Sequence, residues 1–117
     1  MAVRSFERGL KLARRGDTVQ ASEKLYKAVE EGIKALAMAK DLDEARRALR
    51  RRGWGTRLLD RAAARLGEEA LRAWVAGYYL HVEGFHEARL GVDEVMNKVP
   101  LIEPLIQEVR RLLDEGS

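Results

Sequence analysis

The fold is decided by residues 16–40, GDTVQASEKLYKAVEEGIKALAMAK, which hold a helix boundary followed by a long amphipathic repeat. A glycine at position 16 can close one helix in the left-handed conformation, and Asp17 can cap the next one. Gln20 lies three residues later and makes an aspartate version of the capping box. Apolar side chains then recur at helical spacing as far as about Lys40, namely Val19, Leu25, Val29, Ile33 and Leu36. The stretch therefore predicts a long α-helix with one buried side.

The rest of the chain is also helical in its spacing, and no stretch alternates apolar and polar residues over the length of a strand. The other expected helices cover residues 3–15, 41–52, 56–67 and 68–90, with one turn at 93–98 and a last helix that begins at Pro104. Asp41 with Glu44, and Thr56, are the expected caps of the third and fourth helices. The sequence thus predicts one all-α domain over residues 1–117, a bundle of about five to six helices around two long ones.

The composition argues against a dedicated nucleic-acid binder and against a disulfide-bonded protein. The 22 basic and 19 acidic residues give a net charge of +3, well below the excess typical of a dedicated nucleic-acid binder. The basic residues comprise 16 arginines and 6 lysines, and cysteine is absent, a pattern that suits a thermophile but that a GC-rich genome also produces. There is no N-terminal signal segment and no apolar run of about 18 residues, so we expect a cytoplasmic protein without disulfides.

Small residues mark one side of each long helix. They are Gly77, Gly84 and Gly91 with Ala70 and Ala73 on the later helix, and Ala21, Ala28, Gly32, Ala35 and Ala39 on the earlier one. An interior glycine costs about 0.5–1 kcal/mol of helix stability, so its repetition indicates that another backbone approaches closely. Two arrangements fit equally well, a helix pair within one chain or the seam of a dimer. Gly77, Gly84, Gly32 and Ala28 are the expected contact residues.

Both histidines lie in AWVAGYYLHVEGFHEARL, residues 73–90. The apolar stripe expected on this helix is Leu71, Val75, Tyr78, Val82 and Phe85. In an α-helix His81 and His86 would point about 140° apart, so we expect them not to share a metal ion. Glu83 and His86 have the Glu-x-x-His spacing of di-iron bundles, but no second copy of that motif exists. The expectation is no metal and no cofactor.

Glu83, His86 and Arg89 are spaced one helical turn apart and form an expected polar ridge. One interpretation is a surface row of ion pairs. The other is a catalytic cluster in which His86 transfers a proton and Arg89 contacts phosphate. His81 is expected at the edge of the core, hydrogen-bonded to a backbone or carboxylate group.

An arginine-rich segment begins within the third predicted helix and runs through the fourth. Residues 46–65 contain eight arginines and one acidic residue, Asp60. The candidate contacts for RNA or a nucleotide are Arg47, Arg50, Arg51, Trp54 and Arg57, with His81 from the histidine segment. Guanidinium groups match phosphate oxygens, and an exposed tryptophan can stack on a base. The alternative is that these arginines pair with acidic side chains and that Trp54 folds into the core.

The segments RRGDTVQASEKLYKAVEE, RRGWGTRLLDRAAARL and YYLHVEGFHEARL resemble the archaeal PaREP proteins, small helical proteins of the HEPN-like group. The resemblance implies a core of antiparallel helices, commonly dimeric, with residues 18–40 and 68–91 as the main pair. HEPN-like proteins bind nucleotides or cleave RNA, commonly in toxin–antitoxin or defence systems beside a nucleotidyltransferase. Their ribonucleases use an arginine and a histidine with four to six residues between them. Here the nearest preceding arginine is Arg72, with eight residues between it and His81.

Three hypotheses follow. The first is a homodimeric HEPN-like module that contacts RNA or a nucleotide through the arginine-rich segment and the helix from His81 to Arg89. The second is a divergent, metal-independent ribonuclease that uses His86 with Glu83 and Arg89. The third is a protein-interaction partner of a nucleotidyltransferase.

Overall fold

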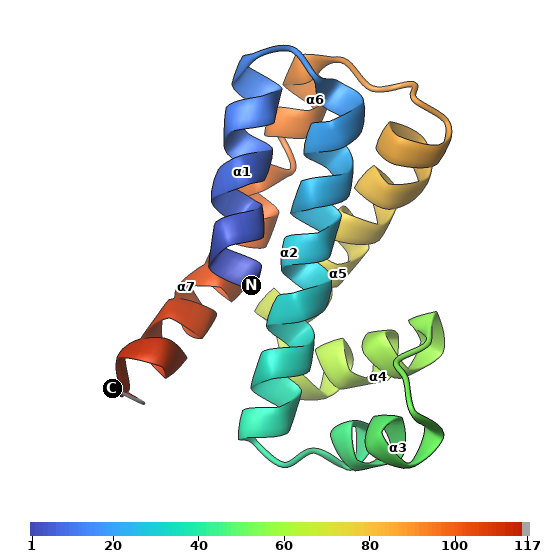
Figure 1. Cartoon of the computed structure of the whole chain (residues 1–117), viewed down its shortest axis with the longest axis vertical. Coiled ribbons are helices and arrows are strands. Elements are labelled where there is room, and N and C mark those ends of the chain that lie inside the picture. The colour runs from blue at the N-terminus through green and yellow to red at the C-terminus, as the bar shows by residue number, and fades with distance from the viewer. Residues whose placement is uncertain (116–117) are drawn as a thin grey trace.

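The computed structural model describes residues 1–115, and all regular structure in this part of the chain is helical. The elements are α1 (Ala2–Arg14), α2 (Thr18–Ala39), α3 (Asp43–Arg51), α4 (Thr56–Leu66), α5 (Glu68–Tyr79), the π-helix η1 (Leu80–His86), α6 (Val92–Met96) and α7 (Val99–Glu115). The all-α prediction is therefore confirmed, with long elements at α2 and at α5 continued by η1 (Figure 1).

Helix α2 is the centre of the bundle. It contacts α1, α5, η1 and α7, while α3 and α4 contact each other and α2. Figure 1 shows α3 and α4 at the end of the bundle where α2 finishes, and α6 at the opposite end. The predicted apolar side of α2 is buried, with Leu25, Val29 and Ile33 wholly inaccessible to solvent. Helix α7 supplies Ile102, Leu105 and Ile106 to the same core.

The predicted apolar stripe of α5 is wrong. Val75 is 60% exposed and Tyr78 is 39% exposed. The buried side of α5 consists of small residues and one large aromatic side chain, namely Ala70, Ala73, Trp74, Ala76 and Gly77. Small residues form this side of α5 because the helix packs closely on α2. A Cβ added at Gly77 would lie 3.1 Å from the Val29 side chain.

The glycine contacts lie within one chain. A Cβ added at Gly84 would come 2.6 Å from Ser22 Cβ, so η1 packs against α2 with no room for a side chain at position 84. A Cβ at Gly32 would meet Leu105 and Val109 of α7 at 3.4 Å. Ala28 is fully buried. Gly77, Gly84, Gly32 and Ala28 therefore serve the internal packing of the bundle, whereas Ala39 is exposed and a Cβ at Gly91 would meet only the nearby Glu94 side chain.

Helix ends agree with the sequence at one boundary and differ at others. Asp17 caps α2 as predicted, its Oδ1 accepting from the Gln20 amide at 3.1 Å. Asp41 is not a cap: it has φ of +51° and its carboxylate accepts from Arg46, while Leu42 precedes α3. Thr56 is the first residue of α4 rather than its cap.

The final helix begins earlier than predicted, at Val99 instead of Pro104. Pro100 occupies the first turn, where a missing N–H costs little, and Pro104 removes one further backbone hydrogen bond from the helix. In residues 1–115, no helix is both long enough and apolar enough to cross a membrane.

Candidate functional site

The histidine segment is not an α-helix. The α-helical part of the predicted helix 68–90 ends at Tyr79, and residues 80–86 form a π-helix, whose ladder is continued by the Glu87 amide donating to the Val82 carbonyl at 2.9 Å. In a π-helix each amide bonds five residues back, so residues five apart come to the same side. The expectation that His81 and His86 point to different flanks is therefore wrong.

The two histidines contact each other directly. His86 Nε2 lies 3.1 Å from His81 Nε2, and His81 Nδ1 lies 3.1 Å from Glu23 Oε1 on α2. The carboxylate partner expected for His81 is thus present, although 58 residues away in sequence. Glu23, His81 and His86 form a polar row from the half-buried flank of α2 to solvent, and His86 is its exposed end. We call these three residues the histidine row.

Aromatic rings enclose the inner part of the histidine row. The Tyr26 ring stacks on His81 with centroids 4.2 Å apart, and Phe85 lies on His81 at 6.1 Å. Burial raises the pKa of Tyr26 to about 12, helped by the negative charges of Glu30 and Glu23, so this phenol stays neutral. Tyr26 consequently covers one face of the His81 ring, and both ring nitrogens have polar partners in the row.

The predicted ridge of Glu83, His86 and Arg89 is not assembled as one cluster. Arg89 donates to Glu87 at 2.7 Å and lies 3.7 Å from Glu83, whereas the polar contact of His86 is with His81. The Arg89 hydrogen bond and charge lower the pKa of Glu87, and the same contacts raise the pKa of Arg89. Arg89 is thus neutralised by two carboxylates.

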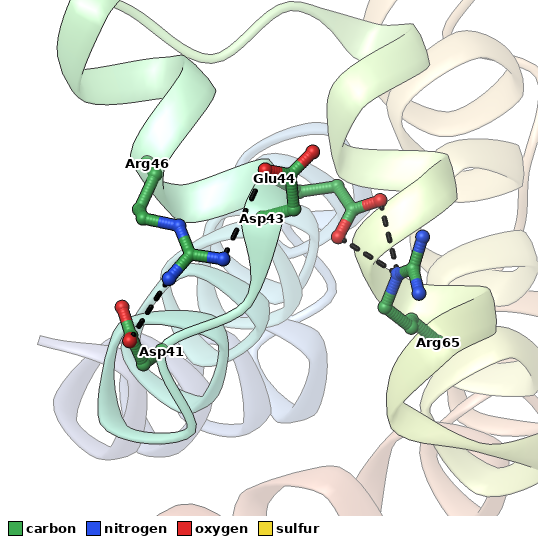
Figure 2. A network of polar contacts seen from close by, with 5 residues as sticks. All are labelled: Asp41, Asp43, Glu44, Arg46 and Arg65. Carbon is green, nitrogen blue, oxygen red and sulfur yellow. Dashed lines mark hydrogen bonds and ion pairs between the residues drawn. The ribbon is translucent and has the colours of Figure 1, made fainter.

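Two of the eight arginines in residues 46–65 are ion-paired, one at the start of α3 and one between α3 and α4 (Figure 2). Arg46 lies 3.0 Å from Asp41 and 3.9 Å from Asp43. Arg65 Nε reaches both carboxylate oxygens of Glu44, donating to Oε2 at 3.1 Å and lying 3.0 Å from Oε1. Because the Glu44 side chain is only 4% exposed, this pair links α4 to the inner side of α3.

The remaining six arginines form no ion pair within residues 1–115. They are Arg47, Arg50, Arg51, Arg52, Arg57 and Arg61, and all except the half-buried Arg47 are exposed. On α3, Arg47, Arg50 and Arg51 share a face, because residues three and four apart are neighbours on a helix. Trp54 is half-buried and packs partly against the core. We call these six arginines the arginine face.

The arginine face and the histidine row lie on different parts of the molecule. The arginine face belongs to α3 and α4 and the turn between them, whereas η1 packs against α2 near the Ser22 end of that helix. Figure 1 shows η1 continuing α5 away from α3 and α4. The structure therefore does not merge the predicted RNA contacts and the predicted catalytic residues into a single cleft.

Comparison with known proteins identifies the family. The sequence pattern of the archaeal PaREP1/PaREP8 family matches residues 1–106. The chain belongs to this family. The crystal structure of a protein from Sulfolobus solfataricus, structural-genomics target SsR10, is similar to this PaREP1/PaREP8 chain with a TM-score of 0.86, 30% identity and coverage of 97% of each chain. A solution structure described under the same target name gives a TM-score of 0.83 at 30% identity, covering 100% of this chain and 95% of the other. No curated protein matches.

Sequence reasoning missed Glu23 and Tyr26 of this PaREP1/PaREP8 protein. Both lie on α2 one turn apart, and nothing in their local sequence distinguishes them from solvent-facing and core positions of an ordinary helix. The available signal was indirect: Gly84 beside His86 indicated that η1 approaches another helix closely. It did not say which residues of that helix would meet the histidines.

Proposed function

We propose that this protein is a small HEPN-like helical module that binds RNA through the arginine face. The observation that carries the proposal is that six arginines on one hairpin have no ion-pair partner within residues 1–115. Surface arginines of a charge-rich protein are ordinarily spread among carboxylates. The six arginines of the arginine face are instead close together and without ion-pair partners, which favours a polyanion as the ligand.

The geometry of the hairpin supports a phosphate backbone in particular. Guanidinium groups one turn apart on α3, and Arg57 and Arg61 one turn apart on α4, present donor forks in two short rows. The tie between Arg65 and Glu44 holds the two helices together, so these rows keep a fixed spacing. The side chain of Leu49, 82% exposed, and the half-buried Trp54 add apolar surface on which unpaired bases can rest.

The proposal includes a homodimer that acts in a toxin–antitoxin or defence setting. The second copy would not use the glycine faces, which the bundle itself occupies. An exposed, mainly apolar groove between α5 and α7 supports a different seam. It is lined by Leu71, Val75, Ala76, Tyr79 and Leu101, together with the charged Glu68, Arg72 and Lys98. Val75 is 60% exposed and Leu101 is 41% exposed.

Fluorescence anisotropy with a short labelled single-stranded RNA tests the binding proposal. With about five phosphate contacts, the logarithm of the affinity should fall against the logarithm of salt concentration with a slope near −3.5. The variant Arg50→Gln/Arg51→Gln removes two contacts and should reduce the magnitude of that slope by about 1.4, besides weakening binding. The matched control is Arg4→Gln/Arg8→Gln on α1, which changes net charge equally.

An equal loss in the control would mean that net charge alone attracts RNA, and the arginine face would be rejected as the site. The same samples decide between the alternatives. Metal-independent RNA cleavage that is lost in both His86→Ala and Arg89→Ala would favour the ribonuclease hypothesis. Absence of RNA binding, with copurification of a nucleotidyltransferase, would favour the interaction-partner hypothesis.

A further inference from the structure

We propose that His81 and His86 bind a divalent transition-metal ion of the zinc class, with Glu23 orienting His81 as a ligand. This inference is independent of RNA binding, because the histidine row lies apart from the arginine face. It rests on three features of the row: the separation of the two nitrogens, the angle between the rings and the contact with the carboxylate.

The first feature is distance. Two ligands of one ion that each lie about 2.0–2.1 Å from it are about 2.8–3.4 Å apart when they subtend a right angle or a tetrahedral angle. The two Nε2 atoms are 3.1 Å apart, within this range. This spacing depends on the π-helix, since an α-helix would separate residues five apart around its circumference.

The second feature is ring orientation. A linear hydrogen bond between two imidazoles at this distance would place the ring centroids about 5.4 Å apart, because each centroid lies behind its own nitrogen. The observed centroid separation is 4.5 Å and the ring planes are 79° apart. The ring axes are therefore bent away from the line between the two nitrogens. Rings that direct their lone pairs at one point beside that line are bent in this way.

The third feature is Glu23. A carboxylate at 3.1 Å from His81 Nδ1 accepts the proton of that nitrogen. The Nδ1–H tautomer leaves the Nε2 lone pair free to bind an ion. Metal-binding histidines commonly have such a carboxylate partner, which fixes the ring and raises its basicity. Stacking on Tyr26 fixes the same ring from its face.

The residues also indicate the class of ion and its coordination. Imidazole suits zinc, cobalt, nickel and copper, whereas magnesium and calcium require oxygen ligands. Within residues 1–115, no third His, Cys, Asp or Glu side chain joins the pair in a metal-binding group. The ion would therefore keep positions open to water or to an external ligand, as catalytic zinc ions do and structural ones do not.

Titration of the untagged protein with Co²⁺ followed by Zn²⁺ competition, read by visible absorption and calorimetry, tests the proposal. His81 and His86 are the only histidines of the chain, so a tag-free sample attributes imidazole ligation without ambiguity. Glu23→Gln should weaken binding about 10–100-fold, the usual effect of removing the partner of a metal-binding histidine. His81→Ala and His86→Ala remove a ligand and should each weaken it by more than about 100-fold. Glu30→Gln, on the same helix and paired with Lys34 instead, is the matched control.

Circular dichroism of each variant without metal checks that the bundle is intact. If a variant does not fold, NMR of the wild-type protein is used in place of that variant. Zn²⁺ should shift the Nε2 resonance of both rings, whereas both Nδ1 atoms should remain unligated. Absence of saturable metal binding by the wild type would overturn the proposal, and so would unchanged affinity in either histidine variant. Either result would leave the pair as a hydrogen bond between two imidazoles.

Discussion

Glu31 ties the beginning of α1 to the middle of α2. Its carboxylate accepts from the N-terminal ammonium at 2.9 Å and from the Ser5 hydroxyl at 3.1 Å. Burial alone would raise the pKa of Glu31, but these two hydrogen bonds, with the charges of the ammonium and Lys27, bring it below its ordinary value of 4.5. The residue is thus a local source of pH-dependent stability.

Glu31→Gln should lower the free energy of unfolding near neutral pH by about 0.5–1 kcal/mol, as expected for a partly exposed ion pair. A carboxylate whose pKa is lowered on folding stabilises the protein above its unfolded pKa, and that contribution disappears as the pH falls through its folded pKa. Urea unfolding should therefore show wild type and variant converging in acid. Glu103→Gln, at an exposed position of α7, is the control. A difference between wild type and Glu31→Gln that persists at low pH would contradict this account.

At the scale of elements, η1 packs closely against α2 at Gly84 and Ser22. Ser22 is fully buried and its hydroxyl donates to the Thr18 carbonyl at 2.7 Å, so it cannot move aside easily. Gly84 lies directly against it. Any side chain at position 84 would push η1 away from α2 and separate His81 from Glu23.

Gly84→Ala should therefore lower the free energy of unfolding by about 1–3 kcal/mol, the usual cost of overpacking a core. Ser22→Gly makes room for the new methyl group, so the double variant should recover part of the loss in a double-mutant cycle. The control is Gly53→Ala, since a Cβ added there meets nothing within 4 Å. Additive effects of the two substitutions would show that the two positions do not contact each other.

The elements were predictable wherever local chemistry decides them. Gly16 with Asp17 marked a real boundary, and the apolar repeat of α2 identified its buried side. The π-helix was not predictable, because LHVEGFH satisfies an α-helical pattern equally well. The partner of His81 was not predictable either, and neither was the role of Asp41, whose carboxylate accepts a hydrogen bond from Arg46. These outcomes depend on contacts between segments distant in sequence.

At the scale of the whole molecule, α3 and α4 form a basic hairpin on a bundle whose own helices are tightly packed through small residues. The apolar groove between α5 and α7 belongs to the bundle and not to the hairpin. The proposed association and the proposed RNA binding would therefore use separate surfaces, and a second copy would leave the arginine face accessible.

Val75→Asp places a charge in the apolar groove and should raise the dissociation constant of the proposed homodimer by at least about tenfold. A tenfold change corresponds to about 1.4 kcal/mol, and burying an unpaired charge costs several times that free energy. Sedimentation velocity over a range of concentrations measures this. Leu49→Asp is the control, as Leu49 is 82% exposed on α3 and lies outside the groove. A wild-type protein that stays monomeric throughout the range would refute the dimer, and equal dissociation by both variants would refute the groove as its seam.

The π-helix has a consequence for reading the relatives of this chain. Inserting one residue into an α-helix without disturbing its flanks produces a wide turn of this kind. A relative that lacks one residue between the two histidines would have them four apart on an ordinary helix, and they would again face the same way. Aligned column by column, the two sequences would appear to have lost one histidine and gained another. In this family, an insertion or deletion between the histidines should be read as a change of helix type that preserves the pair.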